Sequence, residues 1–390
     1  MSEPAKNPGL VPESYQTKKP EMMRALEGAQ GQLQPAYPVL AANGGSYIDG
    51  VPTLKWGEFK DCTYSGCVAL WLNVMGVNAT YEQVAGLTGS CYRLSMCYGW
   101  DPGSCIVNTS YSLLKGFADA CGADDNANRA FGFEFFTVED EAERDEKVQK
   151  SIDSGIPVLA LGGTFFAEWN ILTGYEKTED GIKCFGRSYF DHFSLANEIC
   201  THNRYSLANR YPGQAPGLFL KLCKQSCEPT PAKEALKRSL ETCLSMFGAP
   251  KARKSKRLGY GAYQFMIDSL KRNRYYNSIK KTTKYKDVEM YFSNLLDARR
   301  AAHIYLAESA PLLSGENRAR LLRVAAMYKA MFDVLSAVLP YEKLCNNEFE
   351  AGLSAELRQE IIGALQKMIS LEKQARVVVR EILDNWEETT

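Results

Sequence analysis

The sequence is poor in histidine, has no excess of either charge and contains no long apolar run. Its 390 residues include 3 histidines, and 46 Lys and Arg balance 46 Asp and Glu. A neutral chain has no general electrostatic attraction for nucleic acid or for an acidic partner. Its longest apolar runs fall far short of the roughly 18 residues that a membrane-spanning helix needs. These absences exclude a membrane-spanning role and argue against nucleic acid as a partner.

Two further signals are missing from the sequence: the apolar core of a secretion signal and the cysteine spacing of a zinc site. The stretch MSEPAKNPGLVPESYQTKKP has no apolar core of a secretion signal, so we expect a cytoplasmic protein. In that reducing compartment the 12 cysteines are expected to be buried thiols. Their spacings, such as Cys91-x5-Cys97 and Cys223-x3-Cys227, do not form the C-x2-C pairs of zinc sites. We therefore expect no metal and no cofactor.

The chain divides into three parts. Residues 1–45 are predicted to be an extended leader rich in Pro, Gly and Gln. Residues 46–227 are predicted to form an α+β domain, and residues 228–390 show helical apolar spacing without convincing strands. Pro229 and Pro231 mark the boundary. The predicted fold class is α+β, with an all-α helical bundle after the first domain.

Within the first domain, helices precede an antiparallel sheet. Apolar spacing predicts helices over residues 65–75 and 80–87, the second capped by Thr80. The stretch RAFGFEFFTVED is predicted as a strand, EDEAERDEKVQKSIDSG as a helix that ends at Gly, and IPVLALGG as a buried strand. WNILTGYEKTEDG and IKCFGRSYF are predicted to pair as a hairpin.

Cys62 is the strongest candidate for chemistry. It precedes a helix whose first turn offers unpaired backbone N–H groups, and the helix dipole there favours an anion. A thiol at this place is expected to have a lowered pKa, which suits a nucleophile. The local sequence is equally consistent with an idle buried thiol. Cys67, among apolar residues of the same helix, is expected to be core.

A thiolate nucleophile needs a proton acceptor, usually histidine. His192 follows the predicted hairpin and is the only histidine near the expected sheet. His202 is assigned to a loop, and His303 lies in the middle of a predicted helix of the second domain. His192 is therefore the candidate to assist Cys62.

Four stretches resemble a bacterial papain-like group: DCTYSGCVALWLNVMG, TYEQVAGLTGSCYRLSMCYGWDPG, SGIPVLALGGTFFAEWNILTGYE and FGRSYFD. The group includes the butirosin biosynthesis protein H-like enzymes, which move an aminoacyl group from an acyl carrier protein onto an amine. It is related to the cysteine peptidases that trim double-glycine leaders. The resemblance implies a papain-like first domain, a helical second domain and an acyl carrier protein as a candidate partner.

The resemblance also implies roles for particular positions. Cys62 corresponds to the nucleophile, and Glu168 stands where the group has its histidine. The Asp or Asn of the following strand would fall near Arg187 or Ser188, and Trp56 stands near the place of the oxyanion-binding glutamine. A carboxylate can act as a general base when burial raises its pKa. Beside a thiolate it is also a like charge, so the two groups would share one proton.

A small-molecule site is predicted between the irregular stretch CYRLSMCYGWDPGSC and Glu168. That stretch combines apolar area with a few polar groups, as ligand pockets do. The fork of Arg93 suits a carboxylate or phosphate, although a packed loop anchored by Trp100 is an equal reading. The predicted substrate-binding residues are Tyr92, Arg93, Trp100, Asp101, Trp169 and Arg187.

Three functional hypotheses follow. The first is a cysteine-dependent amide hydrolase or acyltransferase that uses Cys62 with Glu168 or His192. The second is a papain-fold protein without chemistry that binds a small molecule or a peptide. The third is a scaffold whose basic run Lys251–Arg257 binds an acidic partner. A homodimer formed through the helical domain is a further alternative.

Overall fold

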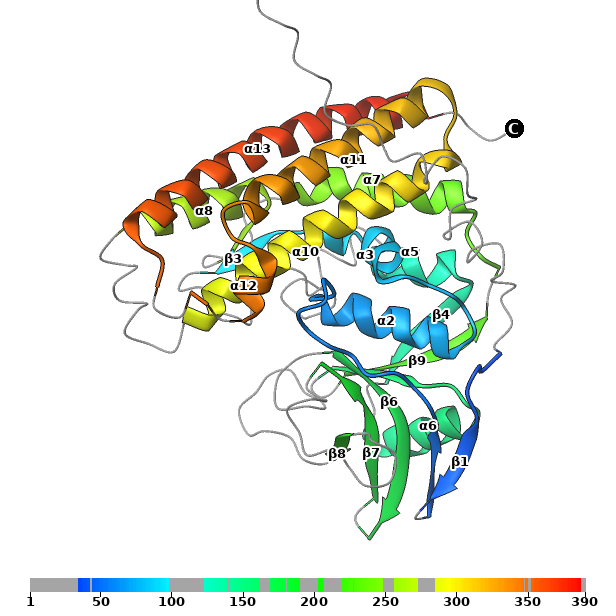
Figure 1. Ribbon diagram of the computed structural model, residues 1–390. Helices are drawn as coiled ribbons and strands as arrows, with labels where there is room; N and C mark the ends of the chain where they lie inside the picture. Colours follow the sequence, from blue (N-terminus) through cyan, green and yellow to red (C-terminus); the bar gives the residue numbers. More distant parts are fainter. Residues whose placement is uncertain are drawn as a thin grey trace, which may run out of the picture.

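The computed structural model is a layered α+β structure in which most helices lie on one side of an antiparallel sheet and α6 (Glu141–Asp153) packs against its other side (Figure 1). None of its described helices has the length and apolarity needed to cross a bilayer. The described residues are 34–42, 44–97, 123–138, 141–161, 169–179, 181–189, 203–206, 219–226, 228–247, 256–272, 285–346, 348–349 and 352–386.

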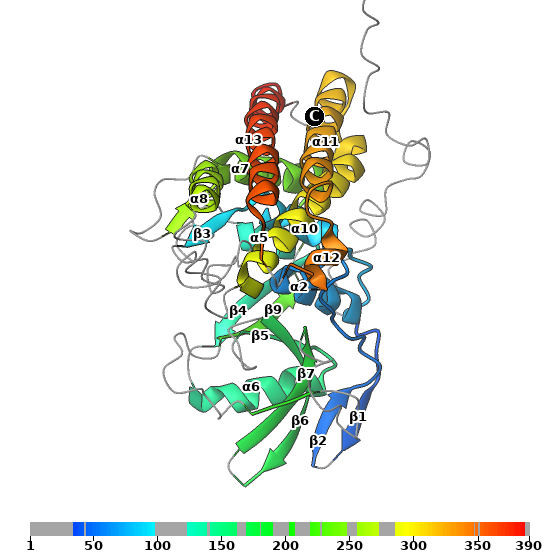
Figure 2. The ribbon, with the colours of Figure 1, turned by 60° about the vertical axis from the view of Figure 1, so that its left-hand side comes forward.

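One antiparallel sheet forms the base of the molecule (Figure 2). In the described part of the chain it has 8 strands, ordered β1-β2-β6-β5-β9-β4, with β7 paired to β6 and to β8. The long strand β6 is central because it pairs with β2, β5 and β7. The strands are β1 (Val39–Ala42), β2 (Gly45–Ile48), β4 (Phe133–Val138), β5 (Val158–Leu161), β6 (Trp169–Thr178), β7 (Gly181–Ser188), β8 (Asn203–Ser206) and β9 (Phe219–Ser226).

The predicted hairpin is confirmed. β6 and β7 pair from Asn170 opposite Ser188 to Thr178 opposite Gly181, and Gly181 takes a positive φ of 122° at the turn. The two other predicted strands are also present, as β4 and β5. β1 lies inside the segment predicted as an extended leader, so part of that segment belongs to the sheet.

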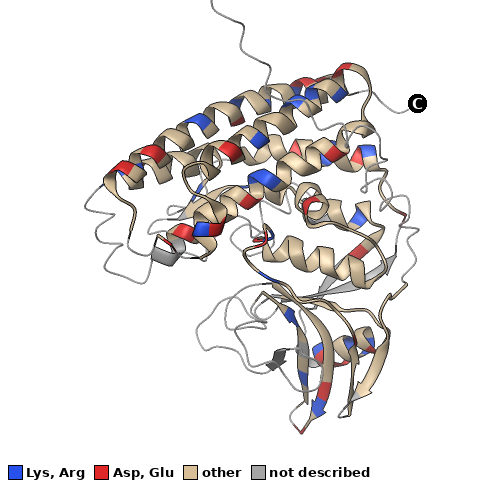
Figure 3. Cartoon of the chain, viewed as in Figure 1, with Lys and Arg blue, Asp and Glu red and all other residues tan. Residues whose placement is uncertain are grey.

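Helix α2 (Thr63–Val74) lies between the sheet and the helices of the C-terminal region (Figure 1). Its sequence TYSGCVALWLNV is apolar all round and carries no charge (Figure 3), and 11 of its 12 residues are buried. A helix of this kind must be covered on every side. The indole N–H of Trp71 donates to the carbonyl of Pro157 at 2.7 Å, which ties α2 to the start of β5.

The local signals of two further predicted helices are also confirmed. Helix α3 (Tyr81–Leu87) begins at Thr80, whose hydroxyl accepts the N–H of Gln83 while the Gln83 side chain accepts the N–H of Thr80. This reciprocal capping box satisfies two backbone donors of the first turn. Helix α6 (Glu141–Asp153) is followed by Gly155 at a φ of 75° and packs on the sheet.

The helical C-terminal region packs directly onto the first half of the chain. Helix α10 contacts α3 and the short 3-10 turn η2 (Ser90–Tyr92), and α7 contacts α5 (Ala123–Ala130). Buried apolar side chains from both halves form one continuous cluster. The helices of this region are α7 (Ala232–Phe247), α8 (Tyr260–Lys271), α10 (Tyr285–Ser309), α11 (Gly315–Ser336), α12 (Tyr341–Cys345) and α13 (Ala355–Asp384), with the 3-10 turn η4 (Ala310–Leu312).

The prediction of a purely helical second half is wrong at one place. β10 (Lys256–Leu258) is a strand and pairs antiparallel with β3 (Ser95–Cys97). β3 belongs to the stretch that the sequence predicts as irregular. A two-stranded ribbon this short has no local signature, because its stability comes from the partner strand about 160 residues away in sequence.

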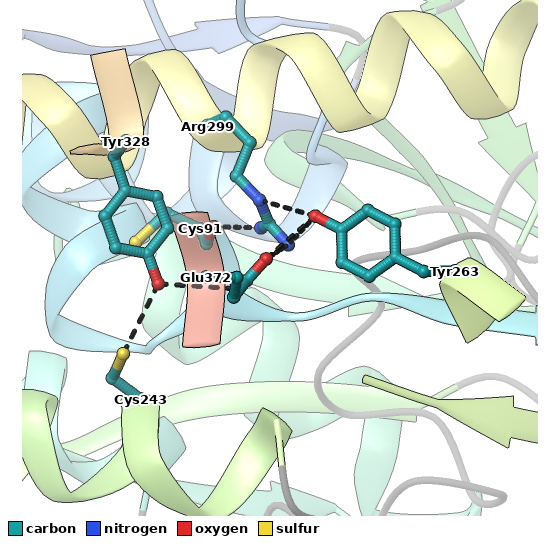
Figure 4. A network of polar contacts seen from close by, with 6 residues as sticks. All are labelled: Cys91, Cys243, Tyr263, Arg299, Tyr328 and Glu372. Atoms are coloured by element: carbon teal, nitrogen blue, oxygen red, sulfur yellow. Dashed lines mark hydrogen bonds and ion pairs between the residues drawn. The ribbon is translucent and has the colours of Figure 1, made fainter. Parts of the chain in front are cut away.

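A buried polar network fastens the helices to η2 (Figure 4). The guanidinium of Arg299 forms an ion pair with Glu372 at 3.0 Å and donates to the carbonyl of Cys91 at 2.8 Å. The hydroxyls of Tyr263 and Tyr328 donate to the same carboxylate at 2.8 and 3.4 Å. The network therefore joins η2 to α8, α10, α11 and α13 in one place.

Candidate functional site

Cys62 is the N-cap residue of α2, with an extended backbone at φ −79° and ψ 101°. Only 3% of the residue is exposed. Burial raises the pKa of the thiol to about 11, and the negative charge of Asp297 adds to that rise, whereas hydrogen bonds with Ser65 and the charge of Arg93 lower it. The expectation of a lowered pKa is therefore wrong in this closed arrangement, because desolvation outweighs the field of the helix start.

The first turn of α2 meets the start of β6. The N–H of Trp169 lies 3.4 Å from the hydroxyl of Thr63, and the Trp169 ring meets Tyr64 edge to face at 5.1 Å. Tyr189, directly after β7, reaches α2 from the other strand: a Cβ on Gly66 would strike its hydroxyl. The cap of α2, the start of β6 and the end of β7 therefore converge.

Two buried carboxyl groups lie beside Cys62. The N–H of Asp61 donates to Oδ2 of Asp297 at 3.1 Å, and the Tyr81 hydroxyl donates to the same oxygen at 2.5 Å. Tyr81 in turn accepts the N–H of Cys62 at 2.9 Å. The hydroxyl of Tyr341 donates to Oδ1 of Asp61 at 2.8 Å. We call Asp61 and Asp297 the carboxyl pair.

The carboxyl pair is electrostatically unusual. Asp61 is 7% exposed and Asp297 is 1% exposed, and neither forms an ion pair with any Lys or Arg of the described chain. Burial raises the pKa of Asp61, and burial together with the charge of Asp61 raises the pKa of Asp297 well above its usual range. One of the two groups therefore holds its proton at a pH where an exposed Asp is ionised.

Two predicted pocket residues lie in the packing between the halves. Tyr92 belongs to the buried core, with its hydroxyl 3.4 Å from that of Ser239 on α7. The guanidinium of Arg93 is buried, donating from Nη2 to the carbonyl of Thr88 at 3.1 Å and from Nε to the sulfur of Met246 at 3.3 Å. Of the two readings of this stretch, these contacts favour a packed loop over an open pocket wall at both residues, because α7 covers the stretch after α3.

The other two described candidates flank α2. Trp169 is fully buried against Tyr64, so its ring is core. Arg187 stands opposite Ile171 across the hairpin, and its Nε donates to the carbonyl of Val51 at 2.7 Å. Both residues lie at the strand ends that meet the cap of α2.

Several predicted residues lie outside the described part of the chain: Trp100, Asp101, Glu168, His192, His202 and residues 251–255 of the basic run. Two other predictions can be checked. Cys67 is fully buried in α2, as expected for core. His303 contacts the carbonyl of Ala325 through Nδ1 at 3.1 Å, and burial lowers the pKa of its imidazole. His303 therefore lies in the middle of a helix, α10, as predicted, and packs on α11.

Sequence reasoning missed the carboxyl pair and its two tyrosines. Asp61 is adjacent to Cys62, but nothing local indicates that it is buried. Asp297 has small buried residues one turn away on either side, Ser293 and Ala301. An acidic residue between such positions on a helix is a usable signal of a buried carboxyl group.

Two further features of the described chain concern metal binding and the surface. No group of three or more His, Cys, Asp or Glu among the described residues could hold a metal ion. A shallow surface groove of about 460 Å³ runs between α7 and α13. Its lining residues are Glu241, Leu244, Ser245, Arg376, Arg380 and Leu383.

The comparisons with known proteins leave the family open. No model of a protein family matches the chain, and no curated protein sequence matches it. Any functional conclusion therefore rests on the convergence at the cap of α2 and on the carboxyl pair beside it.

Proposed function

We propose that the chain is a cysteine-dependent acyl-transfer enzyme with a papain-like first domain, in which Cys62 carries the acyl group as a thioester. One observation carries the proposal: a cysteine caps a buried helix whose first turn contacts the start of one strand and the residue after the next. Helix-start amides stabilise an anionic sulfur and a developing oxyanion. The two strand ends are where the resemblance expects a base and the group that orients it.

The proposed chemistry has two steps. In the first, a base takes the proton of the Cys62 thiol and the sulfur attacks the acyl carbonyl carbon. The bond from that carbon to the leaving nitrogen or sulfur breaks, and the leaving group takes the proton. In the second, an amine or water attacks the thioester and the Cys62 thiol is released. An amine gives transfer, and water gives hydrolysis.

The proposed base is Glu168 or His192. Glu168 immediately precedes Trp169, whose N–H meets Thr63 beside Cys62. The acyl donor would be a small molecule, a peptide or an acyl carrier protein. Because Cys62 is 3% exposed, its covering must move before any of these donors can reach the sulfur. The effect of the helix start on the thiol is then no longer outweighed by burial.

A second candidate function is binding without chemistry. It is favoured by the raised pKa of the Cys62 thiol, about 11, and by the N–H of Cys62, which already donates to the Tyr81 hydroxyl at 2.9 Å. An oxyanion hole needs such an N–H to be available to the substrate. In this reading the cleft of a papain-like fold holds a small molecule or a peptide, and Cys62 is only packed.

Capture of the acyl-enzyme separates the two functions. The protein is incubated with N-acetylcysteamine thioesters of acetyl and aminoacyl groups, and each cysteine is then read by peptide mass spectrometry. The first function predicts an acyl adduct on Cys62 that is absent in Cys62→Ala and kept in the matched variant Cys67→Ala. Absence of any Cys62 adduct, or one no faster than on other cysteines, would overturn it in favour of binding.

A further inference from the structure

The carboxyl pair joins parts of the chain that are 236 residues apart in sequence. Asp61 lies directly before the cap of α2, and Asp297 lies on α10. The hydrogen bonds to the pair come from uncharged donors: the hydroxyls of Tyr81, Tyr341 and Ser293 and the backbone N–H groups of Asp61 and Gly57. Oδ1 of Asp297 is buried and accepts no hydrogen bond from the described residues. Among the residues that the structure describes, the pair is thus well packed but lacks a compensating charge.

Two ionised carboxylates cannot be buried together at low cost without a cation. Each would lose its hydration, and each would repel the other in a medium of low polarity. The two cations that follow Asp297 on α10 are already paired, Arg299 with Glu372 at 3.0 Å and Arg300 with Glu82 of α3 at 2.8 Å. Retaining one proton between the two carboxyl groups removes most of this cost, as in other carboxyl dyads.

The described groups around the pair do not offset the negative charge that the pair would carry if the shared proton were lost. Three of the neighbouring groups are acids or thiols that stay neutral until alkaline pH, because burial raises the pKa of each. The negative charge of Glu82 further raises the pKa of Asp297, and the positive charge of Arg93 lowers the pKa of the Cys62 thiol. The titratable and charged groups around the pair are Cys62, Tyr81, Glu82, Arg93, Tyr189, Arg300, Tyr341 and Cys345.

We propose that Asp61 and Asp297 form a proton-sharing latch that holds α10 and α12 against the cap of α2 and releases them when the shared proton is lost. The contacts that the latch maintains lie directly beside Cys62: Asp297 holds Tyr81, which accepts the Cys62 N–H, and Asp61 holds Tyr341 of α12. Loss of the proton places two negative charges in the contact and drives the helices away. The latch would thereby control access to the thiol.

The direction of the pH effect follows from linkage. Both folded pKa values are raised above that of an unfolded Asp. Protons bound to the pair therefore stabilise the closed form, and this stabilisation is lost as the pH rises through the folded pKa values. The latch does not require Cys62 to be a nucleophile, because it concerns only whether reagents reach the sulfur.

The test is the alkylation rate of Cys62 in the full chain with iodoacetamide, read site by site, in wild type and in Asp297→Asn. Asparagine keeps an oxygen for the Tyr81 and Asp61 donors and carries no charge. Asp333→Asn is the matched control, since Asp333 is exposed and pairs only with Lys329 on its own helix. At about pH 9 we expect the alkylation rate of Cys62 to be at least about tenfold lower in Asp297→Asn than in the wild type. A tenfold change corresponds to a stabilisation of the closed form by about one pK unit. The control variant should alkylate at the wild-type rate.

Simple electrostatics predicts the opposite result. Removing the charge of Asp297 lowers the pKa of the Cys62 thiol and would make alkylation faster. Equal or faster alkylation of Asp297→Asn would therefore overturn the latch. Asp61→Asn is the second variant and is expected to protect Cys62 in the same way if Asp297→Asn does not fold. The two experiments are independent. A result that overturns the latch does not bear on the acyl-enzyme, and the absence of an acyl-enzyme does not bear on the latch.

Discussion

Replacement of Arg299 by methionine tests the buried network that joins the two halves of the chain. Arg299 and Glu372 are 1% and 3% exposed at their side chains and lie 3.0 Å apart. Methionine keeps much of the length and apolar volume of the stem but removes the charge and every donor. The Glu372 carboxylate then keeps only the hydroxyls of Tyr263 and Tyr328, and the Cys91 carbonyl loses its donor from the guanidinium.

The expected loss is large because a charge is left buried without its partner. Breaking one side of a buried ion pair costs roughly 3–5 kcal/mol, and an orphaned carbonyl adds about 1 kcal/mol. Against a typical total stability of about 5–15 kcal/mol, Arg299→Met should lose a large share of its free energy of unfolding. The double variant Arg299→Met, Glu372→Gln removes the stranded charge and should recover at least about 2 kcal/mol of that loss.

Urea unfolding, followed by far-ultraviolet circular dichroism, measures these differences. Arg323→Met is the control, because Arg323 is 57% exposed at its side chain and reaches Glu381 only at 3.6 Å. The control should change stability by less than about 0.5 kcal/mol. The reasoning would be refuted if Arg299→Met were no more destabilised than the control, or if the double variant were as unstable as the sum of its single changes.

Three further predictions concern the cap of α2 and its surroundings. Gly66→Ala should lower the free energy of unfolding by about 1–3 kcal/mol, because the added Cβ strikes the Tyr189 hydroxyl. Gly363→Ala, with open space around the added Cβ, should raise the free energy of unfolding by about 0.5–1 kcal/mol. Thermal unfolding that ranks the two variants in the opposite order would contradict the packing. Thr80→Ala should cost about 1 kcal/mol through the lost capping box, as read by urea unfolding, and an unchanged midpoint would show that the cap contributes nothing. The free energy of unfolding of the wild type should fall as the pH rises above about 4, because the pKa values of the carboxyl pair are raised on folding. Asp297→Asn should make this dependence of stability on pH weaker. An equal dependence on pH in both proteins would refute the shared proton.

Local features of the fold could be predicted from the sequence because their causes are local. The α3 start at Thr80 follows from a capping box four residues long, and the β6–β7 hairpin from alternating apolar residues around a turn. The position of Cys62 at a helix start was also predictable. Its raised pKa was not, because the burial depends on α10 and α12, which are more than 200 residues away in sequence.

The buried charges show the same limit. Arg299 interrupts an apolar stripe that includes Leu295 and Ala302, which is a visible signal of a buried cation. Its partner Glu372 lies on another helix, and no spacing rule connects the two. The meeting of Asp61 with Asp297 is likewise a tertiary event. A sequence pattern can therefore mark which charged residues are buried, but it cannot say which of them meet.

The most direct test of the central claim, that Cys62 is held protonated beneath α10, is its own titration. Site-resolved alkylation of the wild-type chain from about pH 6 to about pH 12 gives the apparent pKa of each cysteine. The account predicts an apparent pKa for Cys62 above the value of about 8.5 for a free cysteine, because burial raises the pKa of the thiol, with rapid labelling only at alkaline pH. A value below about 7.5, with rapid labelling at neutral pH, would contradict it and show an activated thiolate in an open site.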